Sequence, residues 1–273
     1  MAKTLYVFAG SVWAAAAELA TAELYPEGAI ESKSVNLVEG ENFAPEFLKL
    51  NPNGTLPTLE ADGKVYTSTA DVVAYLAKES PSNVKPATEI TTTIHEQKYD
   101  PNFAMLLSRN DAELSAKGSG MAGHFTTRRQ VGLEKYAASA EGAQFKAFYD
   151  AKLAQNGGLL AIIQGKAPEE AKTGLFTSSA VHFENIKSGL FELLPSFLPD
   201  SGFIGGDVPG EDDYHVGAWL TRIAATTGVK TADEALKGIE KTYGAPPPAK
   251  LVAYWGAWTA RPSWKKVYAN GLH

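Results

Sequence analysis

The first 80 residues alternate between short apolar runs and helix-favouring stretches. Residues 4–8 are mostly apolar, residues 12–25 are rich in Ala, Glu and Leu, and residues 32–37 alternate in polarity with Val35 and Leu37 on one face. A strand, a helix and a second strand within about 35 residues are typical of a βαβ unit. The pattern therefore predicts two parallel strands joined by a helix.

A short helix, a hairpin and a longer helix are predicted next, over residues 45–48, 56–67 and from 68 onward. Asp62-Gly63 separates the two apolar runs of the hairpin and favours a tight turn. Ser68 is a candidate N-cap, with Asp71 in the acidic first turn and an apolar face after it. The order β-α-β-α-β-β-α predicts a thioredoxin-like α/β domain over residues 1–80.

A polar, proline-containing linker over residues 81–89 separates this domain from a region with little strand signal. Helical periodicity predicts an all-α domain over residues 90–273. The expected helices span residues 90–116, 126–154, 168–194, 211–227, 232–243 and 248–258. In the fourth of them, Val216, Leu220 and Ile223 recur at helical spacing and predict a buried face.

Composition removes several classes of function. The 273 residues contain no cysteine, which excludes a disulfide scaffold, a thiolate metal site and a cysteine nucleophile. The net charge of −6 argues against a general nucleic-acid binder, and no apolar run approaches the ~18–20 residues of a membrane span. The five histidines are dispersed, so no metal and no cofactor are expected. A cytoplasmic protein is the default expectation.

Four segments carry a resemblance to the cytosolic glutathione transferases. Residues 51–59 (NPNGTLPTL) are similar to the family pattern NPxGxxPxL, and residues 67–76 (TSTADVVAYL) to (E/Q)SxAIxxYL. Residues 203–213 and 258–263 resemble two C-terminal patterns of the family. The resemblance implies a thioredoxin-like domain followed by an all-α domain, and it is weakest near residues 109–173, where this chain is longer than a typical member. The enlarged helical domain looks most similar to enzymes of wood- and litter-degrading fungi.

The resemblance also implies residues that bind glutathione. Leu56, before a cis-Pro57, would pair its backbone with the cysteinyl part, and Ser68 would bind the γ-glutamyl carboxylate at a helix N-terminus. Thr67 stands where the family has Glu or Gln. Asn42 is the nearest polar candidate for the glycyl carboxylate. Lys33 and Lys49 are alternatives to Asn42.

Activation of the glutathione thiol needs a donor at the sulfur. Ser11 lies at the turn where serine-type members keep their catalytic hydroxyl, although the same serine could be only a helix cap. Tyr6 is a competing hydroxyl, and a backbone amide near Gly10 is a third candidate. The basic residue that often enters the first helix in the family is missing, because Val12 and Trp13 occupy those positions.

A hydrophobic acceptor site is expected between the domains, lined by aromatic side chains. The first candidates are Phe8, Trp13, Phe125 and Trp219. Further candidates are Phe103, Met105, His124 and Tyr254. Arg128 and Arg129 could meet an anionic group or simply form a solvated helix face. Asp213 matches the family's buried helix-capping aspartate, whose role is in folding.

The resemblance implies an enzyme that conjugates glutathione to hydrophobic electrophiles, as in detoxification of xenobiotics, and that forms a homodimer. Because the chain has no cysteine, the thiol-transferase and glutathionyl-removing branches of the family are closed to it. The alternative is a non-catalytic relative that binds hydrophobic small molecules such as polyphenols. The missing basic residue in the first helix keeps this alternative open.

Overall fold

The computed structural model describes residues 3–273, so residues 1 and 2 of the predicted first domain lie outside the described residues. Contacts group the chain into two compact units. Unit 1 comprises Met1–Lys33, Leu56–Ala104 and Glu184–His273, and unit 2 comprises Ser34–Thr55 and Met105–Phe183. Each unit contains segments of both predicted domains, and the boundaries 1–80, 81–89 and 90–273 stay a prediction.

A four-stranded sheet with the order β2-β1-β3-β4 forms the base of unit 1. Its strands are β1 Thr4–Val7, β2 Glu31–Ser34, β3 Thr58–Ala61 and β4 Lys64–Tyr66. β3 pairs antiparallel with both β1 and β4, and Leu5 lies opposite Leu59 in the buried part of the register. Asp62 and Gly63 both have positive φ, of 51° and 76°, as a two-residue type I′ hairpin requires. The sheet confirms the predicted thioredoxin-like arrangement.

The second strand is shorter than predicted. β2 ends at Ser34, before the buried Val35 and the partly buried Leu37. The Asn36 side chain accepts hydrogen bonds from the amides of Val38, at 2.9 Å, and Glu39, at 3.2 Å. This local turn competes with the backbone hydrogen bonds of the sheet. The prediction of a strand at Val35 and Leu37 was therefore wrong.

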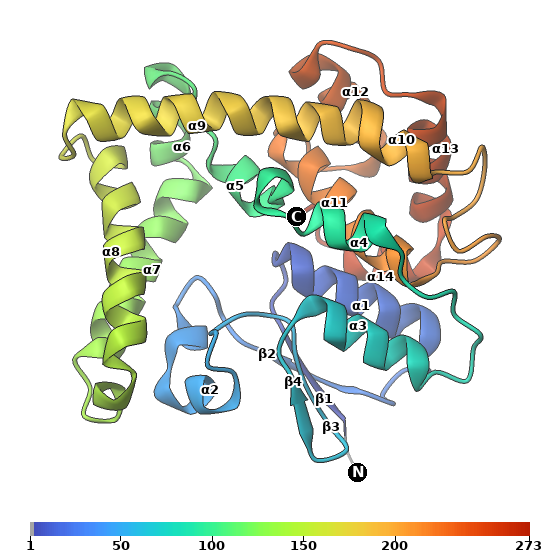
Figure 1. Ribbon diagram of the computed structural model, residues 1–273, viewed down its shortest axis with the longest axis horizontal. Helices are drawn as coiled ribbons and strands as arrows, with labels where there is room; N and C mark the ends of the chain where they lie inside the picture. Colours follow the sequence, from blue (N-terminus) through green and yellow to red (C-terminus); the bar gives the residue numbers. More distant parts are fainter. Residues whose placement is uncertain (1–2) are drawn as a thin grey trace. The chain divides into compact units, whose positions relative to one another are not determined.

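Two helices that pack together, α1 Val12–Leu24 and α3 Thr69–Lys78, follow strands of the sheet (Figure 1). The alanines at 14–17 are fully buried, and their small side chains let α1 pack against α3, α11 Glu211–Thr226 and α14 Pro262–Val267. Val216, Leu220 and Ile223 of α11 are fully buried, as their spacing predicted. The remaining elements of unit 1 include α4 Glu89–Ile94, η2 Gln97–Tyr99, η4 Gly189–Leu193, α10 Leu194–Phe197, α12 Ala232–Tyr243 and α13 Ala249–Ala260.

The buried carboxylate of Asp213 helps to hold the C-terminal helices in unit 1. Asp213, fully buried in the first turn of α11, accepts from the amides of Ile204, Gly205 and Gly210 and from the Tyr254 hydroxyl at 2.8–2.9 Å. Burial raises the pKa of Asp213, and these four donors oppose the rise.

The end of α13 is held to α1 by a carboxylate. The Arg261 guanidinium makes a bidentate pair with Glu23 at 2.6 Å, and Ser263 also donates to Glu23. The segment at 258–263 that resembles the family thus anchors α14, which the periodicity did not predict.

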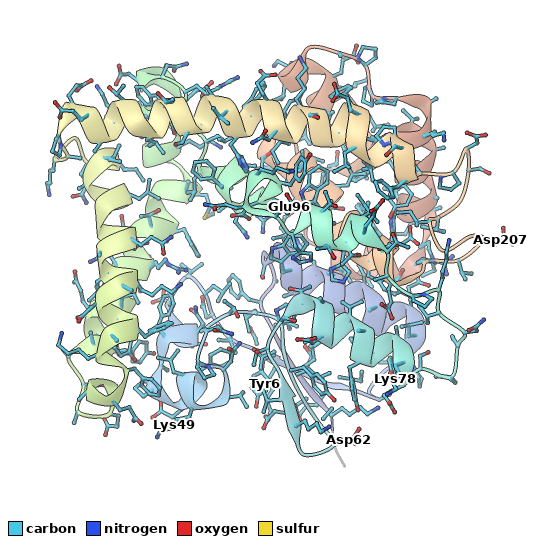
Figure 2. All side chains as sticks on the ribbon, in the orientation of Figure 1. Tyr6, Lys49, Asp62, Lys78, Glu96 and Asp207 are labelled. Atoms are coloured by element: carbon cyan, nitrogen blue, oxygen red, sulfur yellow. The ribbon has the colours of Figure 1, made fainter. Side chains whose placement is uncertain are left out.

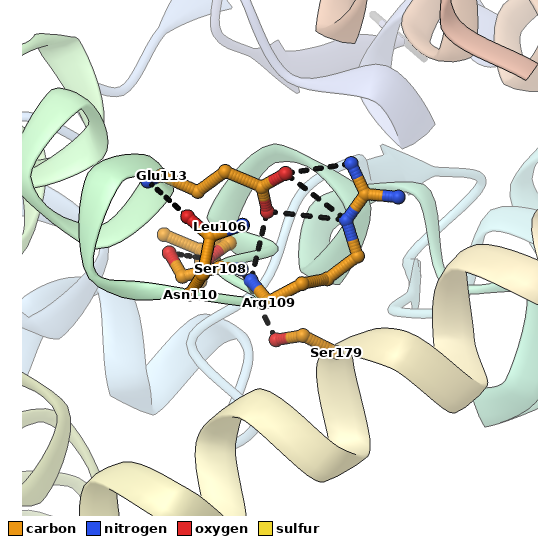
Figure 3. A network of polar contacts seen from close by, with 6 residues as sticks. All are labelled: Leu106, Ser108, Arg109, Asn110, Glu113 and Ser179. Carbon is orange, nitrogen blue, oxygen red and sulfur yellow. Dashed lines mark hydrogen bonds and ion pairs between the residues drawn. The ribbon is translucent and has the colours of Figure 1, made fainter.

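Two of the predicted long helices are interrupted. Residues 90–116 form α4, η2, α5 Pro101–Leu106 and α6 Asp111–Ser119 rather than one helix. Asn110 caps α6 by accepting from the Glu113 amide at 2.9 Å, and Glu113 in turn accepts from the Arg109 amide at 2.8 Å (Figure 3). The Ser108 amide donates to Ser179 Oγ at 3.1 Å (Figure 3). These side chains favour a helix start where the prediction had a helix interior.

The second interrupted helix lies in unit 2, where residues 126–154 divide into α7 Met121–Ala137, η3 Glu141–Phe145 and α8 Lys146–Ile163. Ser139 Oγ donates to the Tyr136 carbonyl at 2.8 Å and accepts from the Gly142 amide at 3.0 Å. A Cβ on Gly142 would lie 2.0 Å from the Tyr136 carbonyl oxygen, so the turn needs glycine. The prediction of 168–194 corresponds to α9 Glu169–Ser188 and the η4 segment after it.

The core of unit 2 joins η1 Glu41–Phe43 and α2 Pro45–Leu50 to α7 and α8. Its buried residues are Phe43, Leu48, Leu133 and Tyr149. The Tyr149 hydroxyl donates to the Phe43 carbonyl at 2.7 Å. Gly132 of α7 lies against Glu39 and Gly40, where a Cβ would come within 2.9 Å of a carbonyl oxygen.

Candidate functional site

The turn between β1 and α1 places Ser11 at the N-terminus of α1. Gly10 has a φ of 99°, in the region that favours glycine, and Ser11 is the N-cap. Ser11 Oγ accepts from the Ala14 amide at 3.4 Å, which is long for a cap. Among residues 3–273, no acceptor takes the proton of the Ser11 hydroxyl. Ser11 can therefore cap α1 and still donate to a ligand atom.

A cation that the sequence did not reveal reaches this turn from α11. A terminal nitrogen of the Arg222 guanidinium donates to the Gly10 carbonyl, one residue before Ser11. Arg222 is only 6% exposed, and burial lowers its pKa, while Tyr268 and Asp100 oppose that shift. An arginine remains protonated even so. A cation 212 positions from Gly10 along the chain thus reaches the turn before the first helix.

Tyr6, the competing hydroxyl, already has an acceptor. Its hydroxyl donates to Glu60 Oε2 at 2.6 Å across the β1–β3 pair, and Figure 2 shows Tyr6 on the sheet. Burial and the Glu60 carboxylate raise the pKa of Tyr6 to about 12. A hydroxyl whose proton is held by a carboxylate is a poor donor to a thiolate, so the geometry favours Ser11 over Tyr6.

The segments predicted to hold glutathione in unit 1 converge at one end of the sheet. Because β1 and β3 are antiparallel with Tyr6 opposite Thr58, the turn after β1 lies beside the residues before β3. Those residues include Leu56-Pro57, whose peptide bond is cis as the resemblance implied. β4 is antiparallel to β3, so its end, followed by Thr67 and Ser68, lies at the same end of the sheet.

Ser68 caps α3 as predicted. Its Oγ accepts from the Asp71 amide at 3.0 Å and donates to Asp71 Oδ2 at 2.6 Å. Ser68 is exposed, and Thr67 beside it is partly buried. The free amides of the first turn and the helix dipole favour an anion at this end of α3, whereas the Asp71 carboxylate opposes one.

Asn42 belongs to unit 2 and is 2% exposed. Its side-chain nitrogen donates to the Gly54 carbonyl at 2.7 Å, which ties η1 to the chain after α2. Lys33 lies 3.8 Å from Glu31. Lys49 is in the last turn of α2. The geometry thus gives Asn42 a structural hydrogen bond, and its role toward a ligand stays a prediction.

The aromatic candidates have different surroundings. Trp219 is 1% exposed and donates to the Tyr99 carbonyl at 2.8 Å, so it belongs to the core of unit 1. Trp13 is partly exposed and stacks on His95, with ring centroids 3.8 Å apart. Phe8 is partly buried in unit 1, and Phe125 lies in α7 of unit 2. Of the four, Trp13 combines partial exposure with a place in the first turn of α1.

A histidine pair that the sequence did not indicate lies behind Trp13. His95 Nε2 is 3.0 Å from His215 Nδ1, and His215 is 1% exposed. Burial lowers the pKa of His95 to about 4 and that of His215 to about 3. Both rings are therefore neutral near pH 7, and neither changes its charge between about pH 5 and pH 8.

Residues 3–273 contain neither a metal-binding cluster nor a membrane-spanning helix. No group of three or more His, Asp or Glu side chains in that range could hold a metal ion. No helix in the same range combines the length and apolar character needed to cross a membrane.

In amino-acid sequence, known proteins resemble this chain mainly over its first third. Residues 5–84 match the family described as the N-terminal domain of glutathione S-transferase. Glutathione S-transferase D7 of Anopheles gambiae is 32% identical over 82 residues, which cover 29% of this chain and 38% of that protein. A zeta-class glutathione S-transferase of Euphorbia esula is 41% identical over 75 residues, which cover 27% of this chain and 31% of that protein. The match thus spans less than two-fifths of the length of either relative.

Solved structures are similar over nearly the whole chain. The beta-etherase LigF of Sphingobium sp. strain SYK-6 has a TM-score of 0.56 at 17% identity, covering 99% of this chain and 100% of that one. Poplar glutathione transferase F1 has a TM-score of 0.55 at 13% identity, covering 99% of this chain and 98% of that one. At these identities the likeness shows a shared fold.

Proposed function

We propose that this chain is a serine-type glutathione transferase that joins glutathione to hydrophobic electrophiles. The match of residues 5–84 to the N-terminal domain of glutathione S-transferase and the fold shared with solved structures support the proposal. The proposal rests mainly on the hydrogen bonding of the Ser11 hydroxyl. Its oxygen caps α1 while its proton remains available, and Arg222 brings a positive charge to the carbonyl beside it.

Glutathione binds at the end of the sheet where the three segments of unit 1 meet. The backbone at Leu56, before the cis-Pro57, pairs with the cysteinyl part. Ser68 and the first amides of α3, with Thr67 beside them, take the γ-glutamyl carboxylate. Asn42 orders the chain that leads to Leu56 through its bond to Gly54.

The chemical step is attack by the thiolate. A free thiol has a pKa of about 8.5, and lowering it by about two units needs roughly 2.7 kcal/mol of preferential stabilisation of the anion. The Ser11 hydroxyl, the N-terminus of α1 and the Arg222 charge supply parts of this. The thiol proton leaves to solvent, the sulfur forms a bond to the electrophilic carbon, and the leaving group departs with its electron pair.

A matched pair of variants tests the role of Ser11. Ser11→Ala should lower kcat with an activated aryl halide at least about tenfold, a loss of about 1.4 kcal/mol of transition-state stabilisation. It should also raise the pKa of the bound thiol in the pH–rate profile. Ser11→Thr keeps a hydroxyl and should retain more activity than Ser11→Ala. An unchanged kcat in Ser11→Ala would exclude Ser11 as the donor.

The superfamily also leads us to expect a homodimer, which sedimentation equilibrium measures directly. Saturable binding of polyphenols, with no turnover of any electrophile in the presence of glutathione, would replace the catalytic proposal with the binding function.

A further inference from the structure

Unit 2 contains an arginine, Arg129, that is partly buried against aromatic rings and has no anionic partner among residues 3–273. The Arg129 guanidinium, on α7, lies 4.6 Å from the ring centroid of Phe43 and 6.0 Å from that of Phe125. Burial alone lowers its pKa. Among residues 3–273, no carboxylate pairs with Arg129 and no hydrogen-bond acceptor meets its donors. The protein therefore bears the cost of desolvating this cation in part, and no ion pair among the described residues offsets that cost.

Arg128, the neighbour of Arg129 in the sequence, has an anionic partner and serves as the comparison. Arg128 donates to both carboxylate oxygens of Glu39, from Nε to Oε1 at 3.2 Å and from a terminal nitrogen to Oε2. Its side chain is 40% exposed. Among the ion pairs of residues 3–273, the Glu39 carboxylate thus pairs with Arg128 and not with Arg129.

A second cation lies close to Arg129. The Lys152 Nζ, on α8, is 5.7 Å from the Phe148 ring centroid, and burial together with the charge of Arg129 lowers the pKa of Lys152. Phe148 and Phe43 are neighbours, with ring centroids 6.0 Å apart. Two partly desolvated like charges beside aromatic rings would both be stabilised by one bound anion.

We propose that Arg129 and Lys152 form a binding site for a small aromatic carboxylate. The planar guanidinium offers a fork of donors that matches a carboxylate in a bidentate pair, and Lys152 adds a point charge. The rings of Phe125 and Phe148 offer apolar surface to the body of such a ligand. The site uses residues of unit 2 alone and does not depend on the proposed transferase activity.

Calorimetric titration with benzoate and with its neutral isostere benzamide tests this site on the full chain. Unmodified protein should bind benzoate at least about tenfold more tightly than benzamide, because the charge is the main determinant. Arg129→Met should weaken benzoate binding at least about tenfold, whereas the matched Arg128→Met should change it less than about twofold. Lys152→Met should have an intermediate effect.

Equal benzoate affinity in the unmodified protein and Arg129→Met would overturn the proposal, as would equal affinity for benzoate and benzamide. Thermal unfolding checks that each variant is folded, and Arg129→Lys replaces Arg129→Met if the latter is not. S-methylglutathione in the same titrations separates two sources of the carboxylate. If Arg129→Met weakens only benzoate binding, the site takes a separate acid. If it weakens both ligands alike, the carboxylate belongs to glutathione. Neither outcome bears on Ser11, which is tested by turnover.

Discussion

The starts of α1 and α3 have the same local design and different electrostatics. Each helix follows a strand of the sheet and begins after a serine N-cap. Ser68 donates its proton to Asp71 at 2.6 Å and accepts from the Asp71 amide at 3.0 Å, so its proton already has an acceptor. Ser11 accepts one long bond at 3.4 Å, and its proton has no acceptor among residues 3–273.

Charge distinguishes the two helix starts further. The first turn of α3 contains Asp71, whereas the first turn of α1 has no acidic residue. Just before α1, the cation of Arg222 is instead bound to the Gly10 carbonyl. A negative charge that develops during a reaction is thus stabilised better at α1. The start of α3 suits a carboxylate that is present throughout and bound mainly by backbone amides.

The largest expected effect comes from removing the cation at α1. Arg222→Met leaves the Gly10 carbonyl without its donor and should cost about 1–3 kcal/mol in the free energy of unfolding. The variant should also raise the pKa of bound glutathione. The loss in kcat/KM should therefore be at least about tenfold near pH 6.5 and should shrink as the pH rises above that pKa.

The charge-conserving variant Arg222→Lys is the control and should keep most of the activity at low pH. His95 and His215 are neutral over this range, so they do not contribute to the profile. A loss in kcat/KM that is the same at every pH would mean that Arg222 acts only through packing.

A smaller effect, on binding rather than on rate, is expected at α3. Ser68→Ala removes the cap and should lower the free energy of unfolding by about 1 kcal/mol. The KM for glutathione should rise about three- to tenfold while kcat changes less than about twofold. Steady-state kinetics on Ser68→Ala and Ser11→Ala side by side measure the contrast. If Ser68→Ala lowers kcat as much as Ser11→Ala does, the two helix starts do not divide binding from chemistry.

The smallest expected effect concerns the acid at α3. Asp71→Asn removes a negative charge beside the proposed carboxylate site and gives the Ser68 hydroxyl a weaker, uncharged acceptor. The KM for glutathione should fall about twofold, while loss of a favourable charge at the helix N-terminus should lower stability by about 0.3–1 kcal/mol. Kinetics and thermal unfolding of the single variant give both numbers. A rise in KM would show instead that Asp71 binds the ligand's ammonium group.

Local signals predicted the helix starts well and the helix interruptions poorly. The boundaries of α12 agree with the predicted 232–243, and the Asp62-Gly63 hairpin and the Ser68 cap are confirmed. The breaks near residues 107–110 and 138–142 were missed. They depend on side-chain bonds such as Ser108 to Ser179, which compete with a helix only once distant segments have packed.

The residues of the site show the same difference: some could be predicted from the nearby sequence and others could not. Ser11 and the cis bond before Pro57 could be expected from nearby residues. The sequence did not show that Tyr6 is a poor candidate for the catalytic hydroxyl. That follows from the sheet register, which places Tyr6 beside Glu60, the acceptor of its proton. Arg222 had no sequence signal, because nothing in the spacing of α11 says which carbonyl its guanidinium meets.

The sequence by itself determined the order of strands and helices in the first 80 residues, the caps at Ser11 and Ser68, and the absence of cysteine chemistry. These depend on interactions within a few residues or on composition alone. The tertiary structure decided which charges stand beside those caps, because Coulomb interactions depend on distance in space. Only the packing of α1 against α11 places a cation at Gly10, and only the packing of unit 2 leaves Arg129 partly buried without an acid among the described residues.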